Sequence, residues 1–99
     1  IVYIEVYDKQ SIIHLRDGRT IKTYQTLSEL ASNLVGDAFL RTHHSYLVNM
    51  VYIHLVQATE FVLITGEKVP IRQSGRKEIK ETYLEYLFSS LRVSSNDNE

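Results

Sequence analysis

The hydrophobic residues of this chain recur mostly with the spacing and the β-branched composition of β-strands. Residues 1–7 are almost all β-branched or aromatic, and residues 10–16 share this bias. We predict a turn between them at Asp8-Lys9. Asp17-Gly18 predicts a type I′ turn, whose two central residues need positive φ, before a third strand over residues 19–24. The N-terminal quarter is therefore predicted to be a meander of three strands.

Two later segments have helical spacing instead. Thr26 and Glu29 have the spacing of a capping box, and the helix that they begin is predicted to end at Gly36. Ser74 is predicted to cap a last helix over about residues 75–91. The apolar stripe of this last helix consists of Ile79, Tyr83, Leu84, Leu87 and Leu91.

Between the two helices the apolar pattern returns to strand type. The predicted strands cover residues 39–41, 46–49, 52–56, 61–65 and 68–71. The chain is thus predicted to be mainly β, with one short central helix and a C-terminal helix. Its last segment, VSSNDNE, has little to bury, so we expect a folded domain over residues 1–92 and a disordered polar tail over residues 93–99.

Length and composition agree with one compact domain. The chain has 99 residues, of which 43% are hydrophobic, and it has no cysteine, which excludes disulfides and thiolate metal sites. It has neither a membrane-spanning run nor a signal peptide, so we expect a soluble, cytoplasmic protein with no membrane partner. Because it begins at Ile1 rather than Met, we expect a fragment of a longer protein.

The net charge of −1 conceals a gradient near the end of the chain. Residues 68–80 contain five basic residues and one acid, whereas residues 81–99 contain four acids and one arginine. By itself this cluster is typical of a solvated helix face, with Glu81 and Glu85 completing helical ion pairs. A basic segment of this kind also fits phosphate binding at the start of a helix.

Two segments of the chain resemble the LytTR family of bacterial DNA-binding domains. FLRTHHSYLVN, residues 39–49, is similar to the family's signature of an aromatic, Arg, His, a basic residue, Ser and a hydrophobic Val-Asn. GEKVPIRQSGRKEIK, residues 66–80, is similar to its Gly and Pro-hydrophobic-Ser-Arg stretch with a basic helix start. YIEVYDKQ resembles the opening strand, and the TLSEL helix also agrees, so the resemblance covers roughly residues 1–87.

This resemblance implies short antiparallel strands in small sheets and DNA binding without a recognition helix. Loops of the family enter successive major grooves on one side of the duplex. The implied function is sequence-specific binding of double-stranded DNA by a transcriptional regulator, as the output domain of a two-component response regulator with a receiver domain upstream. We further expect promoter repeats as the target and a homodimer on DNA.

The contacting residues that the resemblance implies lie in three segments. They are Lys9, Gln10 and Ser11, then Arg41, His43, His44 and Ser45, and finally Arg72, Gln73, Arg76 and Lys77. His44 stands where the family has a basic residue, and Gln73 stands at its usual arginine position. Both remain suited to bases, since His44 can donate to guanine and Gln73 can pair with adenine. Arg72 lies one residue before the family's usual arginine position, so its side chain could instead point to the opposite face of its strand.

Several of these residues also have simpler interpretations. Arg41 fits a surface charge or a partner for Asp37 as well as it fits a DNA contact, and Asn49 is better explained as a turn cap. His43 and His44 are expected to diverge as strand neighbours, which argues against a metal site. Ser45 lacks the glycine-bounded turn of a hydrolase nucleophile, so no enzyme, cofactor or metal is expected. A protein-interaction β-module without DNA binding remains the alternative function.

Overall fold

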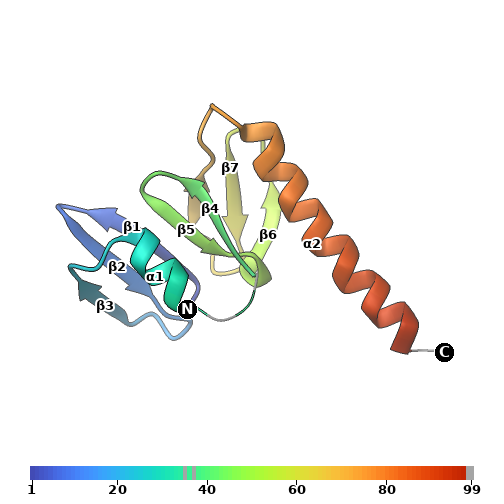
Figure 1. The fold of residues 1–99 in the computed structure, drawn as a ribbon, viewed down its shortest axis with the longest axis horizontal. Helices are drawn as coiled ribbons and strands as arrows, with labels where there is room; N and C mark the ends of the chain where they lie inside the picture. Colours follow the sequence, from blue (N-terminus) through green and yellow to red (C-terminus); the bar gives the residue numbers. More distant parts are fainter. Residues whose placement is uncertain (35, 37, 98–99) are drawn as a thin grey trace.

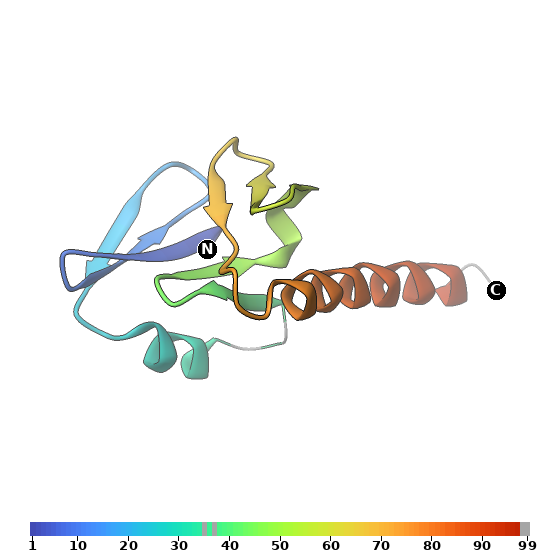
Figure 2. The same cartoon turned by 90° about the horizontal axis from the view of Figure 1, so that it is seen from above.

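The computed structural model describes residues 1–34, 36 and 38–97, with side chains through Leu91. Two antiparallel sheets form, one with the strand order β3-β2-β1-β5-β4 and one with the order β6-β7-β8 (Figures 1 and 2). Their strands are β1 (Tyr3–Tyr7), β2 (Gln10–His14), β3 (Thr20–Thr23), β4 (Phe39–His43), β5 (Tyr46–Asn49), β6 (Ile53–Val56), β7 (Glu60–Leu63) and β8 (Lys68–Pro70). The helices are α1 (Leu27–Asn33), the short 3₁₀ turn η1 (Met50–Tyr52) and α2 (Arg76–Asp97). The predicted mainly β fold with two helices is confirmed.

The two predicted tight turns of the first sheet differ in outcome. Asp8 and Lys9 have φ values of 52° and 63°, so the β1–β2 turn has the positive φ pair of a type I′ turn. At the next turn only Gly18 has positive φ, and its amide donates to the carbonyl of Leu15 at 3.1 Å. The predicted type I′ turn at Asp17-Gly18 is therefore wrong. The loop has three residues with glycine at its left-handed position, an arrangement that leaves Asp17 in its ordinary φ range.

Helix α1 lies against the first sheet and closes a small core. The hydroxyl of Thr26 accepts the amide of Glu29 at 3.1 Å, which confirms the predicted N-cap. Leu27 packs with Ile4 of β1 and Leu47 of β5. The helix ends at Asn33, before Gly36 with its φ of 94°, while Val35 and Asp37 lie outside the described residues. This packing places the start of α1 next to the ends of β1 and β4.

A larger core joins the two sheets to α2. Phe61 and Val69 are fully buried there, and Ile79 and Tyr83 cover them from the helix. Helix α2 follows Gly75, whose carbonyl accepts the amide of Ile79, so Gly75 rather than Ser74 precedes the first turn. None of the helices within the described residues is both long and apolar enough to cross a membrane.

The end of α2 also differs from its predicted position. The helix continues through Asp97, five residues into the segment that was expected to be disordered, while residues 98–99 lie outside the described part of the chain. No glycine or proline follows Leu91 to end the helix, although Ser, Asn and Asp in this segment have low helix propensity. The helix consequently extends well away from the two sheets (Figure 1).

Candidate nucleic-acid interface

The turn between β4 and β5 is held in place by Arg41. Its Nε donates to the carbonyl of His43 at 3.1 Å, and its Nη2 donates to the carbonyl of His44 at 2.7 Å. On the far side of the turn, Leu47 and Val48 of β5 are buried in the two cores. The turn is thus anchored at both ends. The alternative ion pair between Arg41 and Asp37 lies outside the described residues.

The two histidines of this turn face one another. Their ring centroids are 4.3 Å apart with an angle of 33° between the planes. Our prediction that they diverge is wrong, because β4 is irregular between Arg41 and His43 and His44 already belongs to the turn. The amide of Ser45 donates to Nδ1 of His43 at 3.2 Å. His43 is therefore half-buried and supports the turn, whereas His44 is exposed.

The loop between β8 and α2 runs beside this turn. The amide of Arg72 donates to the carbonyl of Thr42 at 2.8 Å, which ties the loop to β4. The side chain of Arg72 then folds back, with Nε donating to the carbonyl of Ser74 at 2.7 Å. Gly75 leaves room for it, since an added Cβ would lie 3.1 Å from Nη2 of Arg72. Because Arg72 lies in a loop rather than a strand, the expected alternation of faces does not apply.

The remaining predicted contacts of this loop separate into exposed and half-buried residues. Gln73 and Lys77 are exposed. Arg76 is half-buried, and its Nη2 donates to the carbonyl of Ile71 at 2.9 Å while its Nε is buried without a partner in the described structure. Lys77 is consequently the more accessible cation at the start of α2, and Arg76 mainly stabilises the loop.

Not all three residues predicted for DNA contact near the β1–β2 turn have accessible side chains. Lys9 is exposed and Gln10 is half-buried, but Ser11 is only 2% exposed and its hydroxyl donates to the carbonyl of Gln25 at 2.6 Å. This hydrogen bond joins β2 to the segment before α1. Ser11 therefore stabilises the fold and has no accessible surface for contact with a base. The resemblance implied its position in the loop, but it did not indicate how deeply the side chain is buried.

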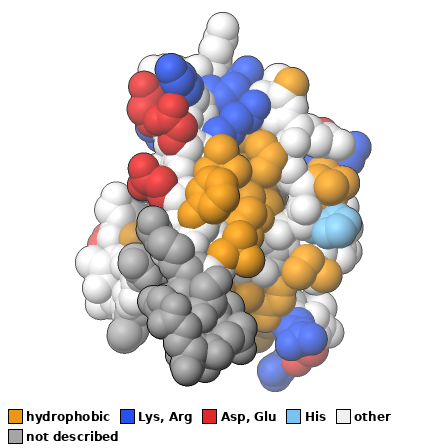
Figure 3. Space-filling model, turned by 90° about the vertical axis from the view of Figure 1, so that its right-hand side faces the viewer, with side chains coloured by type: hydrophobic (Ala, Val, Ile, Leu, Met, Phe, Trp, Pro, Cys, Tyr) orange, Lys and Arg blue, Asp and Glu red, His pale blue; other side chains and the backbone are white. Residues whose placement is uncertain are grey.

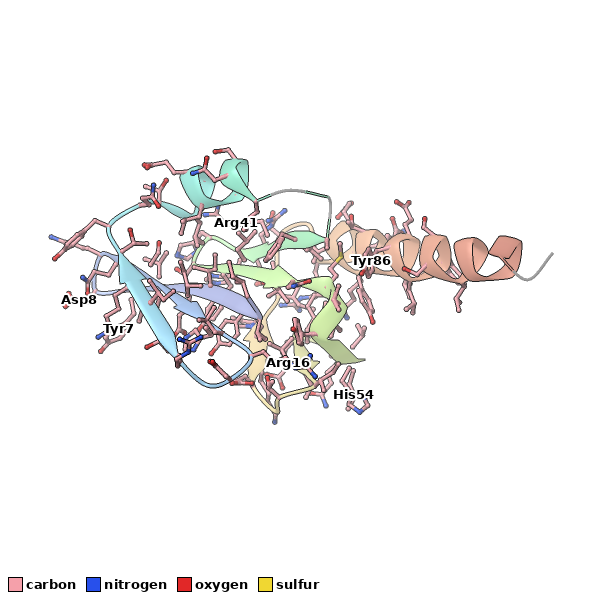
Figure 4. All side chains as sticks on the ribbon, turned by 90° about the horizontal axis from the view of Figure 1, so that it is seen from below. Tyr7, Asp8, Arg16, Arg41, His54 and Tyr86 are labelled. Atoms are coloured by element: carbon pink, nitrogen blue, oxygen red, sulfur yellow. The ribbon has the colours of Figure 1, made fainter. Side chains whose placement is uncertain are left out.

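A hollow of about 210 Å³ connects the β1–β2 turn with the β4–β5 turn. It is lined by Lys9, Arg41 and His44 together with Tyr24, which precedes α1, and Ser28 in the first turn of α1, and no carboxylate lines it. Figure 4 shows Arg41 beside α1, with Tyr7 and Asp8 near the tip of the neighbouring hairpin. Sequence reasoning missed Tyr24 and Ser28, although Tyr24 ends a predicted strand and is 80% exposed. The arrangement suits an anionic ligand.

Comparison with known proteins identifies the family and the fold. The family model of the LytTr DNA-binding domain matches residues 1–83. The chain belongs to the LytTR family. The LytTr DNA-binding domain of a Bacillus cereus protein described as a methyl-accepting/DNA response regulator is similar, with 27% identity and a TM-score of 0.72. The likeness covers 85% of this chain and 80% of that one.

A curated relative is similar at the sequence level. The sensory transduction protein LytT of Enterococcus faecalis (strain ATCC 700802 / V583) is 27% identical over 85 residues, which cover 81% of this chain. The match covers 35% of the relative, so the chain spans about a third of its length. The predicted family, its two-sheet fold and its DNA-binding character are confirmed. The contacts of individual residues with DNA stay predictions.

The other histidines of this LytTR domain lie away from the loops. Nε2 of His14 lies 3.0 Å from a carboxylate oxygen of Glu5, and its ring stacks on Tyr3 with centroids 4.2 Å apart. His54 is exposed on β6 (Figure 4). Asn49 caps η1 by accepting the amide of Val51 and donates to the carbonyl of Ile1, which confirms its structural role. Among the described residues, no three potential metal ligands lie together.

The stability of the domain should fall between pH 7.5 and pH 5.5, in part through His43. Its pKa is lowered from 6.5, first by burial and then by the positive charges of His44 and Arg72. The unfolded chain therefore takes up a proton at a higher pH than the folded one. The stabilisation is complete above pH 6.5 and decreases as the pH falls toward the lower pKa of the folded state.

The measurement is the urea midpoint at both pH values for the wild type and for His43→Gln. The variant should lose less stability between the two pH values than the wild type. Equal slopes in the two proteins would show that His43 keeps its ordinary pKa in the folded state.

Proposed function

We propose that this LytTR domain reads a specific sequence of double-stranded DNA with the loops at one end of its sheets. The observation that supports this most directly is the hydrogen bond between Arg72 N and Thr42 O, which holds the β8–α2 loop against the β4–β5 turn. Lys77 beside the β8–α2 loop and Lys9 in the β1–β2 turn are exposed cations, and His44 is exposed in the β4–β5 turn. Such a surface fits phosphates in position and base edges in the grooves.

Within this surface we assign different roles to different side chains. His44 and Gln73 are exposed and neutral or weakly basic, so they are suited to hydrogen bonds with base edges. Lys9 and Lys77 are exposed cations suited to phosphates, and Arg72 is exposed while its Nε is bonded to the carbonyl of Ser74. Arg41 and His43 support the turn that presents His44, and Ser45 closes it.

The larger setting is also a proposal. We infer that the domain is the output part of a cytoplasmic two-component response regulator, with a receiver domain upstream, and that it acts without catalysis. The similarity to LytT supports this setting, although the chain spans only 35% of that protein. One small domain offers few base contacts, so paired promoter repeats occupied by a homodimer are the expected target.

Selection of binding sites from random duplex DNA tests the proposal directly. One sequence motif should become enriched, and its affinity should fall steeply with added salt because bound cations release counterions from DNA. A protein-interaction module would enrich no motif. Failure to enrich any motif with the folded domain would therefore reject sequence-specific binding and favour the alternative.

Mutations should separate the side chains that contact phosphates from those that contact base edges. Lys77→Ala should weaken all duplexes similarly and lower the salt slope by about one unit, because one phosphate contact is lost. His44→Ala or Gln73→Ala should cost about 1–3 kcal/mol, mainly on the preferred sequence. Affinities for the selected duplex and a scrambled duplex at several salt concentrations provide the measurement. If Lys77→Ala lost only specific affinity, the assignment of roles would be reversed.

A further inference from the structure

The second half of helix α2 carries an apolar stripe that the domain does not cover. Leu84, Leu87, Phe88 and Leu91 are 45%, 40%, 57% and 57% exposed, and they recur at the spacing of one helix face. One turn earlier, Ile79 and Tyr83 are 4% and 7% exposed in the core. The first turns of α2 thus build the domain, whereas the later turns present a hydrophobic face outside it.

This stripe continues onto the second sheet. Lys80 lies on the same side of α2 as Leu84 and Leu87, and its Nζ donates to the carbonyl of Ala58 at 2.9 Å in the turn between β6 and β7. The stripe is therefore turned toward β6, where Val56 is 42% exposed and lies on the same face of the sheet as its strand partner Phe61, which α2 covers. Figure 3 shows hydrophobic side chains gathered in one band on this face.

The size of this surface decides what kind of contact it can support. The four helix residues and Val56 expose on the order of 450 Å² together, which is as large as the biggest apolar patch of a typical monomer. A standard interface covers about 800 Å² on each partner, and about 65% of it is apolar in homodimers. The patch thus supplies about the apolar area that one side of a standard homodimer interface needs.

We propose that this α2/β6 surface binds the same surface of a second copy of the chain, with the two α2 helices antiparallel. The centre of the stripe lies between Leu87 and Phe88. A two-fold axis there places Leu84 against the partner's Leu91 and Leu87 against the partner's Phe88, so each apolar side chain meets another. A stripe without charged residues that is complementary to itself fits a symmetric dimer.

Charge favours the antiparallel arrangement over the parallel one. Parallel helices would bring Lys77 and Lys80 of both copies side by side, where they repel. The antiparallel arrangement instead brings Lys77 toward the C-terminal end of the partner's helix, where free carbonyl groups favour a cation. It also directs the last turns of each helix toward β6 of the other copy, where Val56 is exposed.

Self-association can be tested without DNA, so its failure and the failure of DNA binding are distinguishable. Sedimentation equilibrium of the 99-residue chain should show reversible dimers with a dissociation constant of about 10–500 µM, because ordering the interface side chains offsets much of the gain from apolar burial. The double variant Leu87→Glu with Phe88→Glu should stay monomeric with an unchanged circular dichroism spectrum. Ile21→Glu, on the 51% exposed Ile21 of β3, is the matched control and should dimerise like the wild type.

The absence of cysteine permits a test of orientation. Leu84→Cys and Leu91→Cys are mixed and treated with a short bis-maleimide crosslinker. Antiparallel helices should give mainly the mixed product, whereas parallel helices should give products of each variant with itself. A monomer up to about 1 mM, loss of dimers in Ile21→Glu, or crosslinking only between identical variants would overturn the proposal.

A further experiment, with DNA, rests on the proposed function. On a duplex with two selected sites, the wild type should bind cooperatively, and the Leu87→Glu, Phe88→Glu double variant should bind both sites independently. Its affinity for a single site should stay unchanged, because the stripe lies outside the loops. Independent binding by the wild type would show that this surface does not join two copies on DNA.

Discussion

Arg41→Ala should lower affinity for the selected duplex by about 10- to 100-fold, more than the loss of any exposed cation of the interface. Arg41 donates to the carbonyls of both His43 and His44, and it also lines the hollow beside Lys9. A hydrogen bond from a charged group contributes about 1.5–3 kcal/mol, so losing two of them releases the turn that presents His44. Fluorescence anisotropy with the selected duplex measures the loss.

Two further variants show whether geometry or charge is responsible. Arg41→Lys keeps the charge but cannot bond both carbonyls with a planar fork, so it should recover only part of the affinity. Arg19→Ala is the matched control, because Arg19 is exposed and pairs with Asp17 in the β2–β3 loop at the other end of the hairpin. Full recovery in Arg41→Lys would contradict the positioning role, and an equal loss in Arg19→Ala would indicate a general charge effect.

Most elements of the fold could be predicted because local chemistry and burial agree there. The range of β5 was correct, and the hydroxyl of Thr26 caps α1 as its spacing with Glu29 implies. Asp8-Lys9 formed the expected turn, since the flanking strands pair in the register that a two-residue loop requires. In these segments, no tertiary contact competes with the local preference.

The errors arose where one extra residue or a tertiary contact changed the local geometry. Gly18 alone takes positive φ, so the loop has three residues and Asp17 keeps an ordinary conformation. The irregularity of β4 after Arg41 turns His43 toward His44, which period-two alternation does not describe. A pattern of residue types cannot distinguish such a bulge from a regular strand.

The burial of individual side chains was the least predictable property of the candidate site. Ser11 and Arg76 match the positions of the family's loops, yet Ser11 is buried against Gln25 and Arg76 is bonded to Ile71. Tyr24 is the opposite case, because it ends the predicted strand over residues 19–24 but lies after β3, exposed beside the hollow. Whether a polar side chain serves the fold or a ligand depends on neighbours far away in the sequence.

Phe61→Ala should destabilise the domain by about 3–5 kcal/mol, the largest effect on stability that we expect from one substitution. Phe61 is fully buried in the middle strand of the second sheet, and its ring meets Tyr83 of α2 edge-on with centroids 5.6 Å apart. Removing it leaves a cavity between β7 and α2. Domains of this size have only about 5–15 kcal/mol of stability, so a large part is lost.

The same change should also weaken DNA binding, although Phe61 lies outside the loops. Helix α2 follows directly from the loop that carries Arg72, and Ile79 and Tyr83 dock its first turns on Phe61. Loosening this contact frees the loop to leave β4. Val62→Ala, in the same strand but with a half-buried side chain, should cost about 1 kcal/mol and leave affinity unchanged.

Urea denaturation and duplex titration of both variants provide the measurements, at a temperature where Phe61→Ala is still mostly folded. Phe61→Leu fills most of the cavity and should restore much of both quantities. If Phe61→Ala lost stability but kept full affinity while folded, the orientation of the Arg72 loop would depend on its hydrogen bond to Thr42 rather than on the docking of α2.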